Sequence, residues 1–156
     1  MSSWTRATAT LTFMFLTALT GVAPLHAMKV IYTCGPSKGY SYYLGGGLAS
    51  KADEGWKEDG IRAGIQLIFD DNLALDLVSI GEPSNDFRYS AHGCKITDLR
   101  HDSSELQVIA VCPNQIELFL FNFDGKNSGD LVRVDLASSE LSKHGGAMHS
   151  VCRLGP

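Results

Sequence analysis

The stretch IELFLFNFDGKNSGDLVRVDLA, residues 116–137, decides the fold class of this chain. Residues 116–123 are apolar on both faces of an extended chain, which predicts a central strand covered on both sides. Residues 131–137 alternate between aliphatic and charged side chains, the period of two that is typical of a half-buried strand. Turn residues at 126–129 separate the two segments. The stretch therefore predicts two consecutive strands joined by a short turn.

The same pattern of strand segments separated by turns continues toward both ends of the chain, with turn residues at intervals of roughly eight to twelve positions. Residues 48–64 are polar and glycine-spaced, which predicts a long loop or one short helical turn. No helix-period stretch follows residue 27, so the prediction is an all-β fold: an antiparallel meander of about 8–10 strands that forms a barrel or a sandwich. The other predicted strand segments are 29–34, 40–44, 65–69, 73–80, 87–91, a hairpin over 94–112, and 147–153.

Residues 1–27 have the pattern of a secretory signal peptide. Arg6 provides the positive end, residues 11–22 are apolar, and Ala27 is a small residue at the expected cleavage point. The apolar run is diluted by threonines and is shorter than the roughly 20 residues of a transmembrane helix, so a permanent anchor is the weaker interpretation. A true start at Met28 is the other alternative. The prediction is an exported protein, periplasmic or secreted, whose single β-rich domain covers residues 28–156.

The charge of the predicted mature domain argues against two classes of partner. The chain has 13 Lys and Arg against 17 Asp and Glu; without Arg6 the mature part keeps 12 basic residues and a net charge of -5. Nucleic acids and anionic membranes both require a basic footprint. We therefore expect no nucleic-acid partner, and no membrane contact after signal cleavage.

All four cysteines lie in the mature part, and an exported destination favours disulfides over free thiols or a metal site. Three pairings are open. Cys94 and Cys112 are equidistant from Ser103, so a hairpin with an odd-length loop would place them opposite each other. Cys34 would then pair with Cys152 and join the first and last strands.

Two groups of aromatic residues suggest binding. The stripe of Phe119, Phe121 and Phe123 is either the wall of a cavity for an apolar ligand or ordinary core, and the core interpretation is favoured. The second group lies beside a glycine-rich loop and is either a recognition surface or a cap on the core. Its members are Tyr40, Tyr42, Tyr43 and Trp56.

No catalytic, cofactor or metal motif is present. The acidic residues Asp53, Glu54, Glu58 and Asp59 match no calcium loop, and a solvated loop explains them better. The four mature histidines are scattered over different predicted turns and strands and carry no local hydrolase signature. They are His92, His101, His144 and His149.

Short motifs recur along the mature chain at Cys34, Gly35, Pro36, Gly39, Tyr40, Tyr43, Gly55, Trp56, Asp59, Gly60, Ile61, Met148, Val151 and Cys152. Together they resemble a family of small exported proteobacterial proteins of unassigned function. The resemblance implies a bacterial, periplasmic protein, and its terminal cysteines fit the pairing of Cys34 with Cys152. It implies no catalytic residue, and Cys94 and Cys112 are outside the pattern.

The leading hypothesis is a non-enzymatic exported binding module for a small apolar ligand or a protein partner. A cavity requires the phenylalanine stripe to surround empty space, whereas a docking surface requires exposed Tyr42 and Trp56. The alternatives are a small periplasmic hydrolase, which requires a histidine in a cleft beside a serine or a carboxylate, and an inhibitor of an exported enzyme.

Overall fold

The computed structural model describes residues 29–46, 49–70, 72–81, 87–139 and 143–156. The predicted signal peptide lies outside these ranges. Within them, no helix is long and apolar enough to cross a bilayer. The described strands are β1 (Lys29–Cys34), β2 (Ser37–Tyr43), β3 (Gly55–Ile61), β4 (Gly64–Phe69), β5 (Leu75–Ile80), β6 (Phe87–Arg88), β7 (Lys95–His101), β8 (Glu105–Cys112), β9 (Gln115–Phe123), β10 (Ser128–Ser138) and β11 (Lys143–Leu154), with two 3-10 turns, η1 (Lys51–Asp53) and η2 (Ser90–His92).

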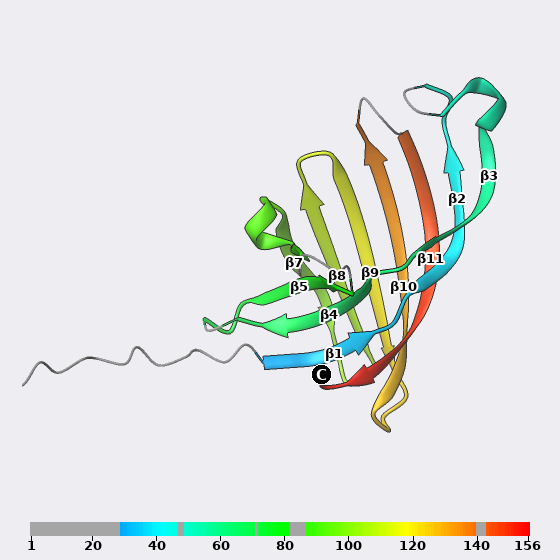
Figure 1. Cartoon of the computed structure of the whole chain (residues 1–156). Coiled ribbons are helices and arrows are strands. Elements are labelled where there is room, and N and C mark those ends of the chain that lie inside the picture. Colours follow the sequence, from blue (N-terminus) through cyan, green and yellow to red (C-terminus); the bar gives the residue numbers. More distant parts are fainter. Residues whose placement is uncertain (1–28, 47–48, 71, 82–86, 140–142) are drawn as a thin grey trace, which may run out of the picture.

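All strands belong to one antiparallel sheet, which confirms the all-β prediction. The order is β6-β5-β4-β1-β11-β10-β9-β8-β7, and β2 and β3 continue the sheet beside β11. The sheet curls into a half-barrel: β7 to β11 form a curved wall, and β1, β4 and β5 cross its lower part on the concave side (Figure 1). The described residues contain 11 strands, more than the 8–10 expected.

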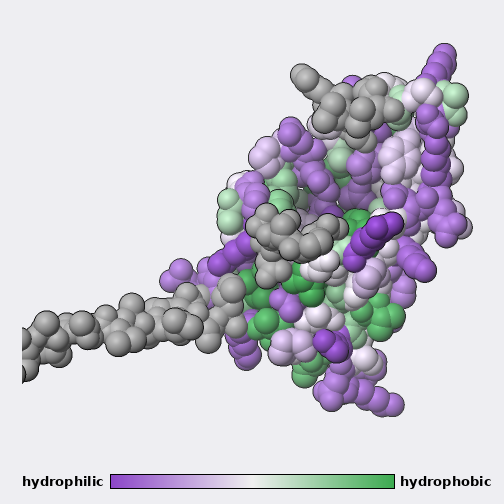
Figure 2. Space-filling view, viewed as in Figure 1, coloured by the Kyte–Doolittle hydropathy of each residue, from purple (hydrophilic) through white to green (hydrophobic). Residues whose placement is uncertain are grey.

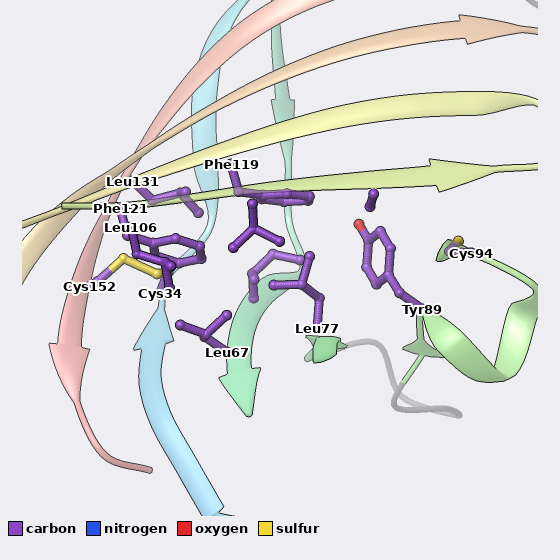
Figure 3. Packing of buried hydrophobic residues seen from close by; sticks show 13 residues of the cluster. Cys34, Leu67, Leu77, Tyr89, Cys94, Leu106, Phe119, Phe121, Leu131 and Cys152 are labelled. Atoms are coloured by element: carbon purple, nitrogen blue, oxygen red, sulfur yellow. A yellow bond between two sulfur atoms is a disulfide. The ribbon is translucent and has the colours of Figure 1, made fainter. Parts of the chain in front are cut away.

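The lower half of the half-barrel contains the hydrophobic core. Leu67 of β4 and Leu77 of β5 face Phe119, Phe121 and Leu131 of the wall (Figure 3). All five side chains are fully buried. Burying such a side chain contributes about 1.5–3 kcal/mol relative to its exposed state. The wall is therefore anchored to the crossing strands in this half.

The first and last strands meet at the lower end through a disulfide. Cys34 of β1 is directly opposite Cys152 of β11, and their sulfurs are bonded. This confirms the predicted pairing. The chain then bends at Gly35 and Pro36, so that β2 pairs with the upper part of β11 while β1 turns away to pair with β4.

Gly39 lies inside β2, although it was expected in a turn. A Cβ at this position would be 2.0 Å from the carbonyl oxygen of Ala147 on β11. Only glycine allows the two strands to approach this closely.

The second disulfide, Cys94–Cys112, is also confirmed, but for a different reason from the one predicted. Asp102 N donates to Glu105 O at 2.9 Å, so the hairpin has a two-residue loop rather than an odd one. An irregularity between Asp98 and Arg100 inserts one extra residue into β7. This β-bulge shifts the register by one and brings the two cysteines opposite each other.

The strand β3 was missed by the sequence analysis, which expected a loop or a helical turn over residues 48–64. Only η1 fulfils that expectation. The sequence of β3, GWKEDGI, shows no apolar face, because β3 pairs with β2 alone and most of its side chains are exposed. An edge strand can be polar because its hydrogen-bonded backbone, not its side chains, attaches it to the sheet.

The predicted strand over residues 87–91 is reduced to the two-residue β6. Buried Asp76 diverts the chain there: its carboxylate accepts from Arg88 Nε at 2.6 Å and from the Ser90 hydroxyl. These contacts start η2 and turn Tyr89 toward the core.

Replacing Asp76 with asparagine is expected to destabilise the protein by about 3 kcal/mol at neutral pH, because it leaves the Arg88 charge without its closest partner. Burial raises the pKa of Asp76, but the bonds from Arg88, Ser90 and the Leu77 amide outweigh it and lower the pKa overall. The stabilisation is therefore fully present above the unfolded-state pKa and is lost progressively as the pH falls from there through the lower folded-state pKa. Urea unfolding at about pH 7 and pH 3 checks this: the gap between wild type and Asp76→Asn should narrow at the lower pH. An equal gap at both values would contradict it.

Candidate binding face

In the upper half of the sheet, apolar and polar side chains are on the opposite faces from those expected of a half-buried strand. Arg133 and Asp135 point to the concave side and are buried, whereas Val132 and Val134 point to the convex side and are exposed. The neighbouring strand β9 has the same arrangement, with Glu117 buried inside. The expectation that residues 116–123 are covered on both sides is therefore wrong, because nothing in the described chain covers the convex side of Ile116 and Leu118.

The strand register places the exposed apolar residues side by side. Two rows cross the upper convex face from β8 to β3, at neighbouring positions along the strands. We define the convex patch as the first row, Val111, Ile116, Leu136, Gly145, Tyr42 and Trp56, together with the second row, Ile109, Leu118, Val134, Ala147 and Tyr40.

The convex patch covers a large area. It crosses six strands, or roughly 24 Å at the ~4.8 Å spacing of neighbouring strands. Contiguous exposed apolar patches of this extent are often functional. Below it on the same face, the next row mixes polar and apolar side chains: Gln107, Leu120, Val132, His149 and Lys38. The apolar side chains are thus most continuous in the upper half.

A groove of about 630 Å³ opens where the patch meets the upper edge of the sheet. Gly145 supplies no side chain, and Leu136, Ile116, Tyr42 and Leu44 also line the groove. Leu136 leans over Gly145, since a Cβ at Gly145 would be 2.7 Å from Leu136 Cδ2.

The structure divides the four aromatic residues predicted as a recognition surface between two faces. Trp56 and Tyr40 are 69% and 59% exposed on the convex side. Tyr42 lies beside Trp56, with ring centroids 5.5 Å apart in an edge-on contact. Tyr43 points instead to the concave side, where its hydroxyl donates to Asp59 Oδ2 at 2.5 Å. Three of the four therefore belong to the convex patch.

The concave side of the upper half carries a polar cluster that the sequence analysis did not find. Tyr89 donates to Glu117 Oε2 at 2.6 Å, and Arg133 is paired with Glu117. His144 Nε2 lies 3.2 Å from Asp135 Oδ2 and its ring stacks on Tyr43. The only signal in the sequence was the alternation of Arg133 and Asp135 with valines, which defines a polar face without saying that it points inward.

Burial has marked effects on the titration of this cluster. It raises the pKa of the Tyr89 hydroxyl and of the Asp135 carboxyl. The pKa of Tyr43 is raised to about 12, first by its hydrogen bond to Asp59 and then by burial. Within the described chain, Arg133 Nε and Asp135 Oδ1 are buried and have no hydrogen-bond partner.

In Figure 2, purple hydrophilic residues dominate the upper part of this view, and green hydrophobic residues gather lower down, around the crossing strands. The convex patch is on the far side of the wall. The phenylalanine stripe belongs to the core: Phe119 and Phe121 are fully buried, and Phe123 stacks on Tyr32 at 4.2 Å. The core interpretation thus accounts for the stripe.

The predicted histidines do not meet in one place. His149 pairs with Asp130 at 2.7 Å on the surface, and His101 lies 3.8 Å from Asp98. His92 Nδ1 contacts the carbonyl oxygen of Arg88 at 2.9 Å. Only His144 lies beside a buried carboxylate, that of Asp135.

The acidic residues near η1 form ordinary surface contacts. Asp53 accepts from Lys57 at 3.0 Å, and Asp59 is held by Tyr43. Among the residues that the structure describes, no group of three or more His, Cys, Asp or Glu is arranged to hold a metal ion.

Comparison with known proteins adds no functional information. No protein-family model, no curated protein and no solved structure matches this chain.

Proposed function

We propose that this protein is a non-enzymatic, exported binding module that docks on an apolar protein surface through the convex patch. It acts in the periplasm or outside the cell, as the signal-peptide pattern and the two disulfides suggest. The observation that carries the proposal is the reversal of faces in the upper half. Aliphatic and aromatic side chains that a soluble fold normally buries are exposed there in two contiguous rows.

A protein partner accounts for the patch better than a small ligand. The patch is broad and convex, whereas small-molecule sites are concave and enclose most of the ligand. Exposed Trp56 and Tyr40, with the groove over Gly145 beside them, are the kinds of feature on which protein interfaces depend.

Catalysis at the His144–Asp135 pair is the less favoured function. A general base must reach a proton on its substrate. His144 Nε2 lies 3.2 Å from Asp135 Oδ2 and the imidazole ring stacks on Tyr43, so the candidate base is held by contacts within the wall. The geometry of this pair therefore suits the stability of the wall better than turnover.

Photo-crosslinking in the producing cells tests the proposal. A photoreactive phenylalanine analogue at Val134, inside the patch, is expected to give a protein adduct at least about tenfold more abundant than the same analogue at Asn122. Asn122 is the matched control because it is exposed on the convex side of the same sheet, below the patch. Adding Leu118→Asp should remove the Val134 adduct by placing a charge in the interface.

Equal labelling at Val134 and Asn122, or no adduct at either, would contradict the proposal. The mass of the adduct also identifies the partner as a second copy or as another protein.

A further inference from the structure

We infer that the protein surface that covers the convex patch is a second copy of this chain, related by a two-fold axis that runs along β10. This inference rests on the proposed function and names its partner. It is based on the shape of the patch, on its charges and on its size.

The shape of the patch is self-complementary about β10. On one side, β9 presents the bulky residues Ile116 and Leu118, which form a ridge. On the other side, β11 presents Gly145 and Ala147 at the same two levels, which form a trough. A two-fold rotation about an axis parallel to β10 exchanges the two sides, so the ridge of each copy meets the trough of the other.

A groove opens beside Gly145 at the upper end of the trough. Its volume is about 630 Å³, and Tyr42 and Leu136 line it. The Leu136 side chain leans toward Gly145, because a Cβ at Gly145 would be 2.7 Å from Leu136 Cδ2. On the axis itself, Val134 and Leu136 of β10 would meet their own counterparts. Such an arrangement is a sheet-on-sheet packing, in which strands of the two sheets lie within about 30° of each other.

The outer strands fit the same symmetry. Because the wall is convex, the two sheets diverge away from the axis, and longer side chains are needed to fill the space. The rotation places Val111 and Ile109 of β8 opposite the larger Tyr42 and Tyr40 of β2.

The charges at the two ends of the rows are also complementary. Lys95 of β7 continues the first row beyond Val111, and Glu58 of β3 ends the second row beyond Tyr40. Both side chains are exposed. The rotation brings Lys95 of each copy to the edge where Trp56 and Glu58 of the other copy lie. Each dimer would therefore contain two such opposite-charge contacts.

The extent of the patch suits a weak dimer. Two rows measure roughly 24 Å across the strands and ~14 Å along them, about 340 Å² in outline per copy, which is less than the ~800 Å² per partner of a standard interface and is typical of a weak, transient contact. Below the patch, Gln107, His149 and Lys38 form a partly polar rim, with Leu120 and Val132 between them.

Sedimentation velocity on the purified, disulfide-bonded protein tests the inference. We expect a concentration-dependent dimer. Ala147→Leu fills the trough and should weaken dimerisation at least about 100-fold by overpacking. Val151→Leu is the matched control, since Val151 is exposed on the same face of β11 below the patch, and it should change the dissociation constant less than about twofold.

A charge reversal tests the symmetry without enlarging any side chain. Lys95→Glu alone places like charges at both contacts and should weaken the dimer about tenfold, whereas adding Glu58→Lys in the same chain should restore it. Failure of the double variant to recover would overturn the proposed axis, as would an unaffected Ala147→Leu dimer.

A wild-type protein that remains monomeric at about 0.5 mM would overturn the inference. In that case a Val134 adduct with another protein would still support the proposed function. Absence of both dimer and adduct would remove both proposals.

Discussion

Replacing Cys34 and Cys152 together with alanine is expected to lower the free energy of unfolding by about 5 kcal/mol. The bond closes a loop with a sequence separation of 118. In the chain-entropy model, a cross-link over such a loop restricts the unfolded chain by about this amount. Because small domains are stable by only about 5–15 kcal/mol, the variant should be at the edge of folding at 37 °C.

The position of this disulfide adds a structural reason. It joins β1 to β11 at the lower end, where both cysteines are buried in the core beside the strands that cross the wall. β1 is also the strand through which β4, β5 and β6 are connected to the rest of the sheet. Loss of the bond should therefore loosen the crossing strands before the wall.

Denaturant unfolding monitored by far-ultraviolet circular dichroism checks this prediction. The matched control is the double alanine variant of Cys94 and Cys112. The bond that it removes closes a loop with a separation of only 18, so the free energy of unfolding should fall by only about 3 kcal/mol. An equal or larger loss in the control would show that loop length does not determine the stabilisation here.

Replacing Arg133 with methionine is expected to cost about 3–5 kcal/mol, because it leaves the buried carboxylate of Glu117 without its cation. Glu117 would keep its bond from the Tyr89 hydroxyl, but a hydroxyl cannot neutralise a buried charge. Arg133 also lies over the Phe119 ring at 5.5 Å, a contact that methionine partly replaces. The charge is therefore the dominant loss.

The double variant Glu117→Leu with Arg133→Met is the control for this second prediction. With both charges removed and a similar volume kept, it should recover at least about 2 kcal/mol relative to Arg133→Met. Guanidinium unfolding at pH 7 measures both variants. If the double variant were less stable than Arg133→Met, the unpaired charge of Glu117 would not be the cause of the loss, and the prediction would be wrong.

The two strands of the opening stretch show how far a sequence pattern can be used. The alternation in residues 131–137 correctly predicts a strand with two different faces. It does not say which face is inside, because the period of two is the same for either orientation. The usual assumption is that the valines are buried. Here the sheet extends beyond the strands that cross it, and Val132 and Val134 are exposed on its convex side instead.

The cysteine hairpin gives a second example. Counting residues from Ser103 predicts the correct partners, although the loop is even and a bulge restores the register. A bulge depends on the local twist of the sheet and has no fixed sequence signature. The pairing could be predicted from the sequence, but the backbone path that achieves it could not.

The candidate site was predicted in part. Rigid amphipathic rings beside a flexible, glycine-rich loop predict a recognition surface, and Tyr40, Tyr42 and Trp56 do lie together on one face. Their partners in the convex patch come from β8 to β11, more than 50 residues away along the chain, and are joined to them only by the register. The polar strand β3, which carries Trp56, was missed because an edge strand needs no apolar face.

By itself, the sequence predicted the all-β class, favoured the two disulfide pairings among the three that were open, and indicated three of the aromatic residues of the patch. These follow from local chemistry: the period of two, the turn residues and the number and spacing of cysteines. Only the tertiary structure decided that the sheet remains a half-barrel and that its hydrophobic side changes face between the lower and upper halves. The reason is that burial depends on which strands cross the wall, and the crossing of β1, β4 and β5 is set by long-range pairing that no local pattern records.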